Sequence, residues 1–192
     1  DCWASLAHMY LDEFRNGFNP EPDPLGRALQ AARCAVDAAP SNSYALDSLA
    51  MVHYFRKEFP AFRVAADRSI ALNPLSASSV AYLGLLIAYT GGWERGLALV
   101  ERAMQINSRH PGWFWFGAFY NAYRTGDYPG ALQFALKINV PGYFYNHLVL
   151  AAAYGKLGER AAAARALEEL LALRPDFPGT LREELGKWHQ PD

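Results

Sequence analysis

The sequence has few of the features that mark secreted or membrane-bound proteins. Only two of its 192 residues are cysteines, Cys2 and Cys34, and they form neither a CxxC pair nor a disulfide framework. We therefore expect a reducing, cytoplasmic setting. No apolar run reaches the roughly 18 residues that a membrane span needs, so no insertion into a membrane is expected.

An excess of charge of one sign is also missing. The chain carries 18 basic and 19 acidic residues, for a formal net charge of -1. Proteins that bind nucleic acid directly usually present a strongly basic face. Attraction to an anionic membrane surface needs clustered cations as well. We therefore expect neither nucleic acid nor a membrane as a direct partner.

Signatures of catalysis and of cofactor binding are absent. The sequence contains no phosphate-binding GxxxxGK[ST] loop, no HExxH zinc motif and no GxSxG nucleophile elbow. Its five histidines are scattered, and a site shared by His8 and His53 would lack a third metal ligand. We therefore expect no catalytic residue, no cofactor, no metal ion and no enzymatic activity.

What the chain does contain is an internal repeat, which its prolines make visible. Pro40 and Pro74 lie 34 residues apart, and so do Pro141 and Pro175. The 67 residues between Pro74 and Pro141 are one short of two further periods, with Ser108 where the missing proline would stand. A fixed period of this length indicates a stack of similar supersecondary units.

Each period has the pattern of two helices joined by a tight turn. Apolar residues recur at helical spacing on both sides, with a small residue such as Ala50, Gly84 or Ala151 in the middle of the first helix. Glycines at 91, 126 and 158 supply the left-handed turn that ends a helix. We expect one repeat domain over residues 1–192, with repeats at about 1–40, 43–74, 77–108, 111–141 and 144–175 and a capping helix at 178–192.

Two repeats depart from this pattern. In the first, the segment "RNGFNPEPDPLGR" at 15–27 carries three prolines and two glycines, so we expect an inserted loop there. In the fourth, "FALKINVP" leaves room only for a shortened second helix.

The repeated residues resemble the tetratricopeptide repeat family over about residues 1–177. The opening helix reads Trp3-x2-Leu6-Ala7-x2-Tyr10, and the last repeat reads Leu150-Ala151-x2-Tyr154, then Gly158, Ala163-x3-Leu167 and Pro175. The resemblance implies an all-α fold, an α–α superhelix of about five helical hairpins plus a C-terminal capping helix. It also implies a non-catalytic scaffold that binds proteins or peptides.

In this family the first helix of each hairpin lines a concave groove. Transferred by register, the resemblance implies that the partner-binding groove contains Tyr44, Met51, Tyr54, Phe55, Tyr89, Trp113, Phe116, Tyr120, Tyr123, Arg124 and Tyr145. The same register places Asp47 and Leu85 on the concave side. With few cations beyond Arg124 and Lys156, this groove is not expected to clamp an acidic chain end.

The aromatic content of the fourth repeat is high. The segment "GWFWFGAFYNAY" holds seven aromatic residues in twelve, more than one helix can bury against its partner. Exposed Trp and Tyr side chains are frequent binding anchors, so we expect them to hold a partner. The alternative is that these rings fill the spaces between repeats.

Two further hypotheses concern the context of the chain. It is similar to the C-terminal repeat halves of bacterial multidomain regulators that carry an N-terminal cyclase or DNA-binding domain. Because the sequence begins at Asp1 without a methionine or a signal-peptide pattern, we expect a fragment of a longer protein. The repeats would then serve regulation through another domain of the same chain, or oligomerisation as a homo-oligomer.

Overall fold

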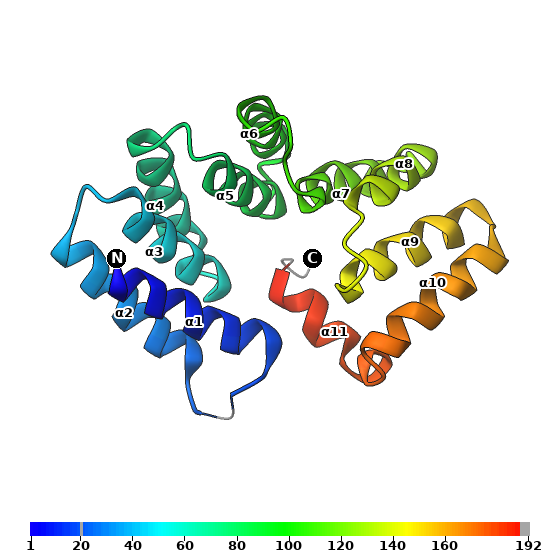
Figure 1. Cartoon of the computed structure of the whole chain (residues 1–192), viewed down its shortest axis with the longest axis horizontal. Coiled ribbons are helices and arrows are strands. Elements are labelled where there is room, and N and C mark those ends of the chain that lie inside the picture. The colour runs from blue at the N-terminus through cyan, green and yellow to red at the C-terminus, as the bar shows by residue number, and fades with distance from the viewer. Residues whose placement is uncertain (20, 189–192) are drawn as a thin grey trace.

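A computed structural model describes residues 1–19 and 21–188. Over these residues the chain is built from helices, without strands, arranged as five antiparallel hairpins that follow one another around an arc (Figure 1). The hairpins pair α1 (Cys2–Asn16) with α2 (Pro24–Ala38), α3 (Ser43–Phe55) with α4 (Phe59–Leu72), α5 (Ala77–Tyr89) with α6 (Trp93–Ile106), α7 (Phe116–Arg124) with α8 (Tyr128–Ile138), and α9 (Phe144–Leu157) with α10 (Arg160–Leu173). The predicted all-α solenoid is thereby confirmed.

The first helix of each hairpin lies on the inner side of the arc and the second on the outer side (Figure 1). Close packing within a hairpin depends on small residues. A Cβ atom added at Gly84 in α5 would lie 2.8 Å from the carbonyl oxygen of Gly96 in α6 and 2.9 Å from Cβ of Leu99. The two backbones therefore touch where a side chain would otherwise hold them apart.

Turns with a left-handed residue join the two helices of the later hairpins. Gly91, Gly126 and Gly158 have φ values of 90, 83 and 78°, in the region that costs glycine little. The corresponding turn of the second hairpin has Lys57 at φ 62° instead. A side chain in this conformation is strained by about 1–2 kcal/mol.

The inserted loop of the first hairpin is shorter than predicted. Helix α1 continues to Asn16 and ends at Gly17, whose φ of 65° forms a left-handed cap. Helix α2 begins at Pro24, where proline fits the first helical turn, and Asp23 accepts a hydrogen bond from the Gly26 N–H. The expected 15–27 loop is therefore wrong at both ends, and Arg15 belongs to a helix.

The first helix of the fourth hairpin is split. A single 3₁₀ turn, η1 (Gly112–Trp115), precedes α7, and α8 is short, as the sequence predicted. This split rotates Trp113 relative to the rings of α7, because 3₁₀ and α turns advance by different angles per residue.

The last described helix, α11 (Phe177–Trp188), turns inward from the end of α10 and runs across the open side of the arc toward α1 and α3 (Figure 1). The Lys187 ammonium donates to the carbonyl oxygen of Arg15 at 3.3 Å, which joins the C-terminal helix to α1. The sequence predicts a capping helix over 178–192; in the structure this helix begins at Phe177 and reaches back to the first two hairpins. Residues 189–192 of the expected cap lie outside the described part of the chain.

Candidate functional site

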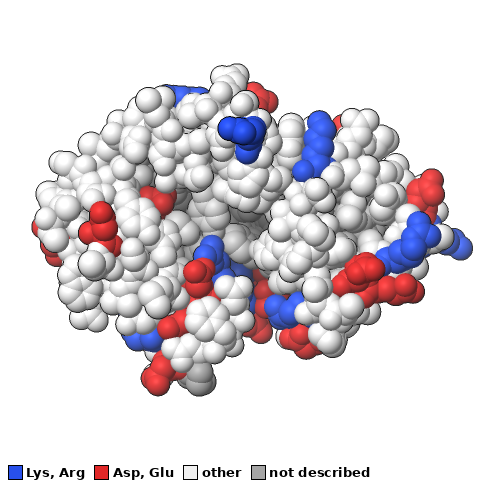
Figure 2. Space-filling model, in the orientation of Figure 1, with Lys and Arg blue, Asp and Glu red and all other residues white. Residues whose placement is uncertain are grey.

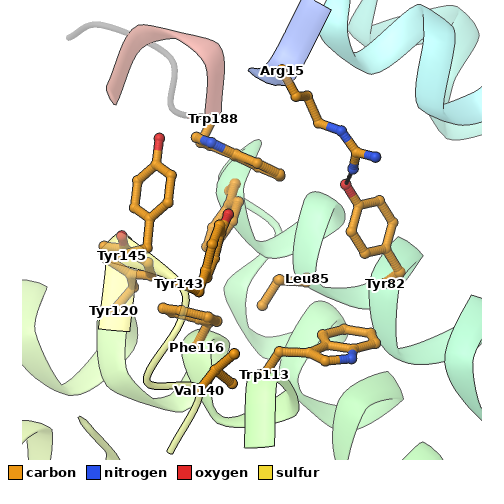
Figure 3. A pocket seen from close by; sticks show the side chains of 11 residues that line it. Arg15, Tyr82, Leu85, Trp113, Phe116, Tyr120, Val140, Tyr143, Tyr145 and Trp188 are labelled. Carbon is orange, nitrogen blue, oxygen red and sulfur yellow. Dashed lines mark hydrogen bonds between the residues drawn. The ribbon is translucent and has the colours of Figure 1, made fainter. Parts of the chain in front are cut away.

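A pocket of about 300 Å³ lies on the concave side of the arc, and α11 forms one of its walls. Side chains from α1, α5, η1, α7, the α8–α9 segment, α9 and α11 converge on it (Figure 3). The lining residues are Arg15, Tyr82, Leu85, Tyr89, Trp113, Phe116, Tyr120, Val140, Tyr143, Tyr145 and Trp188. The space-filling view shows a hollow near the middle of this face, with charged side chains of both signs on one side of it (Figure 2).

Helical spacing explains how the chain brings these residues together. Tyr82, Leu85 and Tyr89 recur at intervals of three and four along α5, so they project from one face of that helix. Phe116 and Tyr120 repeat the same spacing on α7. Two neighbouring first helices thus supply an almost continuous aromatic wall.

Several of these rings pack edge to face with a neighbour in the pocket wall. The centroids of Tyr89 and Tyr120 are 5.4 Å apart at an interplanar angle of 89°. Tyr82 meets Trp113 at 5.9 Å, and Phe116 meets Tyr143 at 6.3 Å, also near perpendicular. Mutual contacts of this kind hold the rings in place before any ligand arrives.

Arg15 is the one charged residue among those that line the pocket. Its Nη1 donates to the Tyr82 hydroxyl at 2.8 Å (Figure 3), and its Nη2 pairs with the Asp12 carboxylate one turn earlier on α1. The Asp12 carboxylate therefore balances the charge of the guanidinium. The other residues that line the pocket are uncharged, so the pocket carries no uncompensated positive charge.

The tyrosines of the pocket remain neutral at physiological pH. Burial raises the pKa of Tyr120, and the nearby Tyr143 raises it further. Burial also raises the pKa of Tyr89 and that of Tyr143. A phenolate is therefore not formed here, and the site suits an uncharged, apolar group.

Five of the predicted groove residues line this pocket, namely Tyr89, Trp113, Phe116, Tyr120 and Tyr145. The other six lie elsewhere. Met51, Tyr54 and Phe55 are buried, with Phe55 packed against Trp188 of α11 at 5.3 Å. The predicted groove is therefore covered along α3, because α11 occupies that part of the concave side.

The remaining three predicted residues are spread along the stack. Tyr44 is partly exposed and stacks on His8 at the N-terminal end, with centroids 5.1 Å apart. Tyr123 meets Tyr128 at the α7–α8 turn, and the Arg124 guanidinium lies 4.4 Å from the centroid of the Trp93 ring. None of the three is among the residues that line the pocket.

Sequence reasoning missed Arg15, Tyr82, Val140, Tyr143 and Trp188. One of them had a readable signal, since Tyr82 shares a helical face with Leu85 and Tyr89. Arg15 was placed in a loop, and Val140 and Tyr143 come from a connecting segment. Trp188 approaches the pocket from the far end of the chain, which no local pattern indicates.

Asp47 on α3 is a buried acid next to this region. Burial raises its pKa to about 7, and within the described chain its Oδ1 has no hydrogen-bond partner. It is close enough to Tyr82 to raise the pKa of that phenol. Asp47 is therefore a carboxylic acid whose charge depends on pH in the neutral range.

Metal-binding clusters and membrane-spanning helices are both absent from the described part of the chain. No three His, Cys, Asp or Glu side chains gather there where they would hold a metal ion. Across residues 1–19 and 21–188, no helix is both long enough and apolar enough to cross a bilayer.

Comparison with known proteins supports the fold. No protein-family model matches the sequence, and no curated protein matches it. Among solved structures, PilW, a widely conserved type IV pilus biogenesis factor, has a TM-score of 0.71 at 13% identity, over 90% of this chain and 78% of PilW. A tetratricopeptide repeat protein from Parabacteroides merdae ATCC 43184 has a TM-score of 0.66 at 16% identity, over 96% of this chain and 74% of its own.

YrrB, a tetratricopeptide repeat protein with an unusual peptide-binding site, has a TM-score of 0.56 at 16% identity, over 95% of this chain and 90% of YrrB. These likenesses show that the chain has the fold of a tetratricopeptide repeat solenoid. They do not bear on a cyclase or DNA-binding domain, a cytoplasmic location or a homo-oligomer, which stay predictions from the sequence. The absence of enzymatic activity stays a prediction too.

Proposed function

We propose that the chain is a protein- or peptide-binding scaffold whose concave pocket holds a large apolar side chain of the partner. The observation that carries this proposal is the lining of the pocket, where eight of eleven residues are aromatic. Preformed aromatic pockets of this kind are where interfaces concentrate their binding energy.

The pocket fits one side chain better than a long extended segment. Its volume of about 300 Å³ is at the low end for ligand sites. A peptide laid along all of the inner helices would meet α11, which covers Tyr54 and Phe55 of α3. Recognition would therefore centre on α5, α7 and the α8–α9 segment, and it would depend on apolar burial more than on charge.

The test is capture of partners from the source lysate by variants that differ only in where a ring is added. Val140→Trp places an indole in the pocket, whereas Leu136→Trp places one on the exposed surface of α8. A partner retained by the wild type and by Leu136→Trp but lost by Val140→Trp supports the proposal. Equal retention by all three would move binding to another surface, and far-UV circular dichroism checks that each chain is folded.

A further inference from the structure

Two sides of the pocket differ in chemistry. Phe116 and Val140 lie along one side, which offers an aromatic ring and an aliphatic group (Figure 3). Arg15 meets the Tyr82 hydroxyl on the opposite side, where its Nη1 donates to the phenol oxygen at 2.8 Å. The pocket therefore has an apolar side and a side with hydrogen-bonding groups, so it can orient a ligand that has both characters.

The Tyr82 hydroxyl has a proton to donate. A phenol hydroxyl donates one hydrogen bond and also accepts. Tyr82 accepts from Arg15, and no residue within 1–19 or 21–188 accepts the proton of Tyr82 in return. The Tyr82 hydroxyl can therefore donate to a ligand while Arg15 holds it in place.

Tyr143 provides a second hydroxyl of this kind. Its ring packs edge to face with Phe116, with centroids 6.3 Å apart, which holds the side chain in the pocket wall. In the described part of the chain its hydroxyl has no hydrogen-bond partner, and the oxygen is not sealed from solvent. Burial raises the pKa of Tyr143 and the phenol of Tyr82 raises it further, so the two hydroxyls lie near each other. Tyrosine hydroxyls inside a protein usually have a partner, so two such donors beside one pocket indicate a ligand atom that accepts from them.

The charged groups around these hydroxyls are already paired. The Asp12 carboxylate pairs with the Arg15 guanidinium, and the Glu184 carboxylate accepts from Lys187 Nζ at 2.9 Å. An anionic ligand would lose its hydration without meeting an unpaired cation among the described residues that line the pocket, and a cationic ligand would face Arg15. The acceptor that fits is therefore a neutral oxygen.

The aromatic lining selects a ring to carry this oxygen, because aromatic walls gain most from an aromatic partner. Among protein side chains, tyrosine joins an aromatic ring to a neutral oxygen that accepts hydrogen bonds. The indole N–H of tryptophan only donates, and phenylalanine has no polar atom. Tyrosine is therefore the side chain that matches both sides of the pocket.

We propose that the pocket recognises a tyrosine side chain of the partner, whose ring packs on Leu85 and Phe116 and whose hydroxyl oxygen accepts from Tyr82 and Tyr143. The inference rests on the proposed function and names the side chain that the pocket holds. A site built to hydrogen-bond a hydroxyl discriminates against the same ring without it, because its own polar groups are then left unpaired. Discrimination between phenol and plain ring is therefore the property to measure.

The probes are p-cresol and toluene, the side chains of tyrosine and phenylalanine, each titrated into the full chain at pH 7. Binding is followed by two-dimensional NMR through the indole N–H signal of Trp113, which is assigned by its loss in Trp113→Phe. We expect p-cresol to bind about tenfold more tightly than toluene, the net effect of two hydrogen bonds. The anion 4-methylbenzoate should bind more weakly than p-cresol.

Three results would overturn the inference, and they differ in what they leave standing. Equal affinities for p-cresol and toluene would show that water satisfies the two hydroxyls, and the apolar pocket of the proposed function would remain. Binding of 4-methylbenzoate as tight as that of p-cresol would contradict the neutral acceptor. A Trp113 signal that neither ring shifts would contradict the proposed function as well.

A change at Tyr143 tests the assigned donor. Tyr143→Phe keeps the ring and removes the hydroxyl, so it should weaken p-cresol binding about fivefold and leave toluene binding unchanged. Tyr154→Phe removes the hydroxyl of a half-buried tyrosine of α9 outside the pocket and should change neither affinity. Equal effects of the two substitutions would contradict the role of Tyr143. The comparison of p-cresol with toluene on the unmodified chain decides the matter if Tyr143→Phe does not fold.

Discussion

Lys57 Nζ lies 2.9 Å from the backbone carbonyl oxygen of Lys187, and this bond joins the second hairpin to the C-terminal helix across 130 residues of sequence. It shows how the arc is closed. Helix α11 connects the first two hairpins with the last one across the concave side (Figure 1). The part of the concave surface that α11 leaves open is the pocket of about 300 Å³. We expect a pocket of this size to suit one side chain better than a long extended segment.

The turn at Lys57 gives a prediction about stability. Lys57→Ala loses the bond to α11 and keeps the strained backbone, whereas Lys57→Gly loses the same bond and relieves the strain. We expect Lys57→Gly to be more stable than Lys57→Ala by about 1 kcal/mol. Urea denaturation of the two variants measures the difference; equal midpoints would show that the turn carries no strain.

Asp47 gives a prediction about pH. Its pKa of about 7 in the folded chain lies above the ordinary value of an aspartate, so the folded chain binds the proton more tightly than the unfolded chain. The resulting stability is fully present below about pH 4 and is lost as pH rises through about 7, by up to about 4 kcal/mol. The stabilisation from Asp47 therefore decreases between about pH 4 and about pH 7, and it does not change further at higher pH.

Asp47→Asn should remove this dependence, because the amide resembles the protonated acid and does not titrate. We expect the variant to be more stable than the wild type at pH 8 and similar to it at pH 4. Thermal unfolding across this range is the measurement, with Asp37→Asn, an exposed acid on α2, as the control. A variant that keeps the slope of the wild type would assign the titration to another group.

Two glycines on first helices should respond oppositely to alanine. At Gly84 a Cβ would lie 2.8 Å from the Gly96 carbonyl oxygen, so Gly84→Ala must push α5 and α6 apart, at a cost of about 1–3 kcal/mol. At Gly155 in α9 a Cβ meets nothing within 4 Å, so Gly155→Ala should stabilise by up to about 1 kcal/mol. Chemical denaturation of both variants checks the signs; destabilisation of equal size would contradict the packing described here.

The fold could be predicted from the sequence because its determinants are local. Prolines such as Pro74 and Pro175 end helices, and glycines such as Gly91 and Gly158 form left-handed turns, wherever the hairpin is placed in space. The wall formed by α5 and α7 followed from the same local spacing, which is why Tyr89, Phe116 and Tyr120 were found.

The rest of the site depends on contacts between distant parts of the chain. Tyr54 and Phe55 were expected in an open groove, but Trp188 covers them, and nothing near residue 54 indicates that a helix from residue 177 onward will arrive. Arg15 was missed because the prolines that follow it suggested an earlier helix end than the Gly17 cap provides. Such placements follow from tertiary packing, which a repeat pattern does not encode.

The most direct test of the pocket as the recognition site is selection from a random peptide library on the immobilised full chain. The wild type and Leu136→Trp should enrich peptides that share a large apolar or aromatic residue, and Val140→Trp, whose pocket is filled, should not retain those peptides. Peptides that bind Val140→Trp as well as the wild type, or that share only charged residues, would contradict the account.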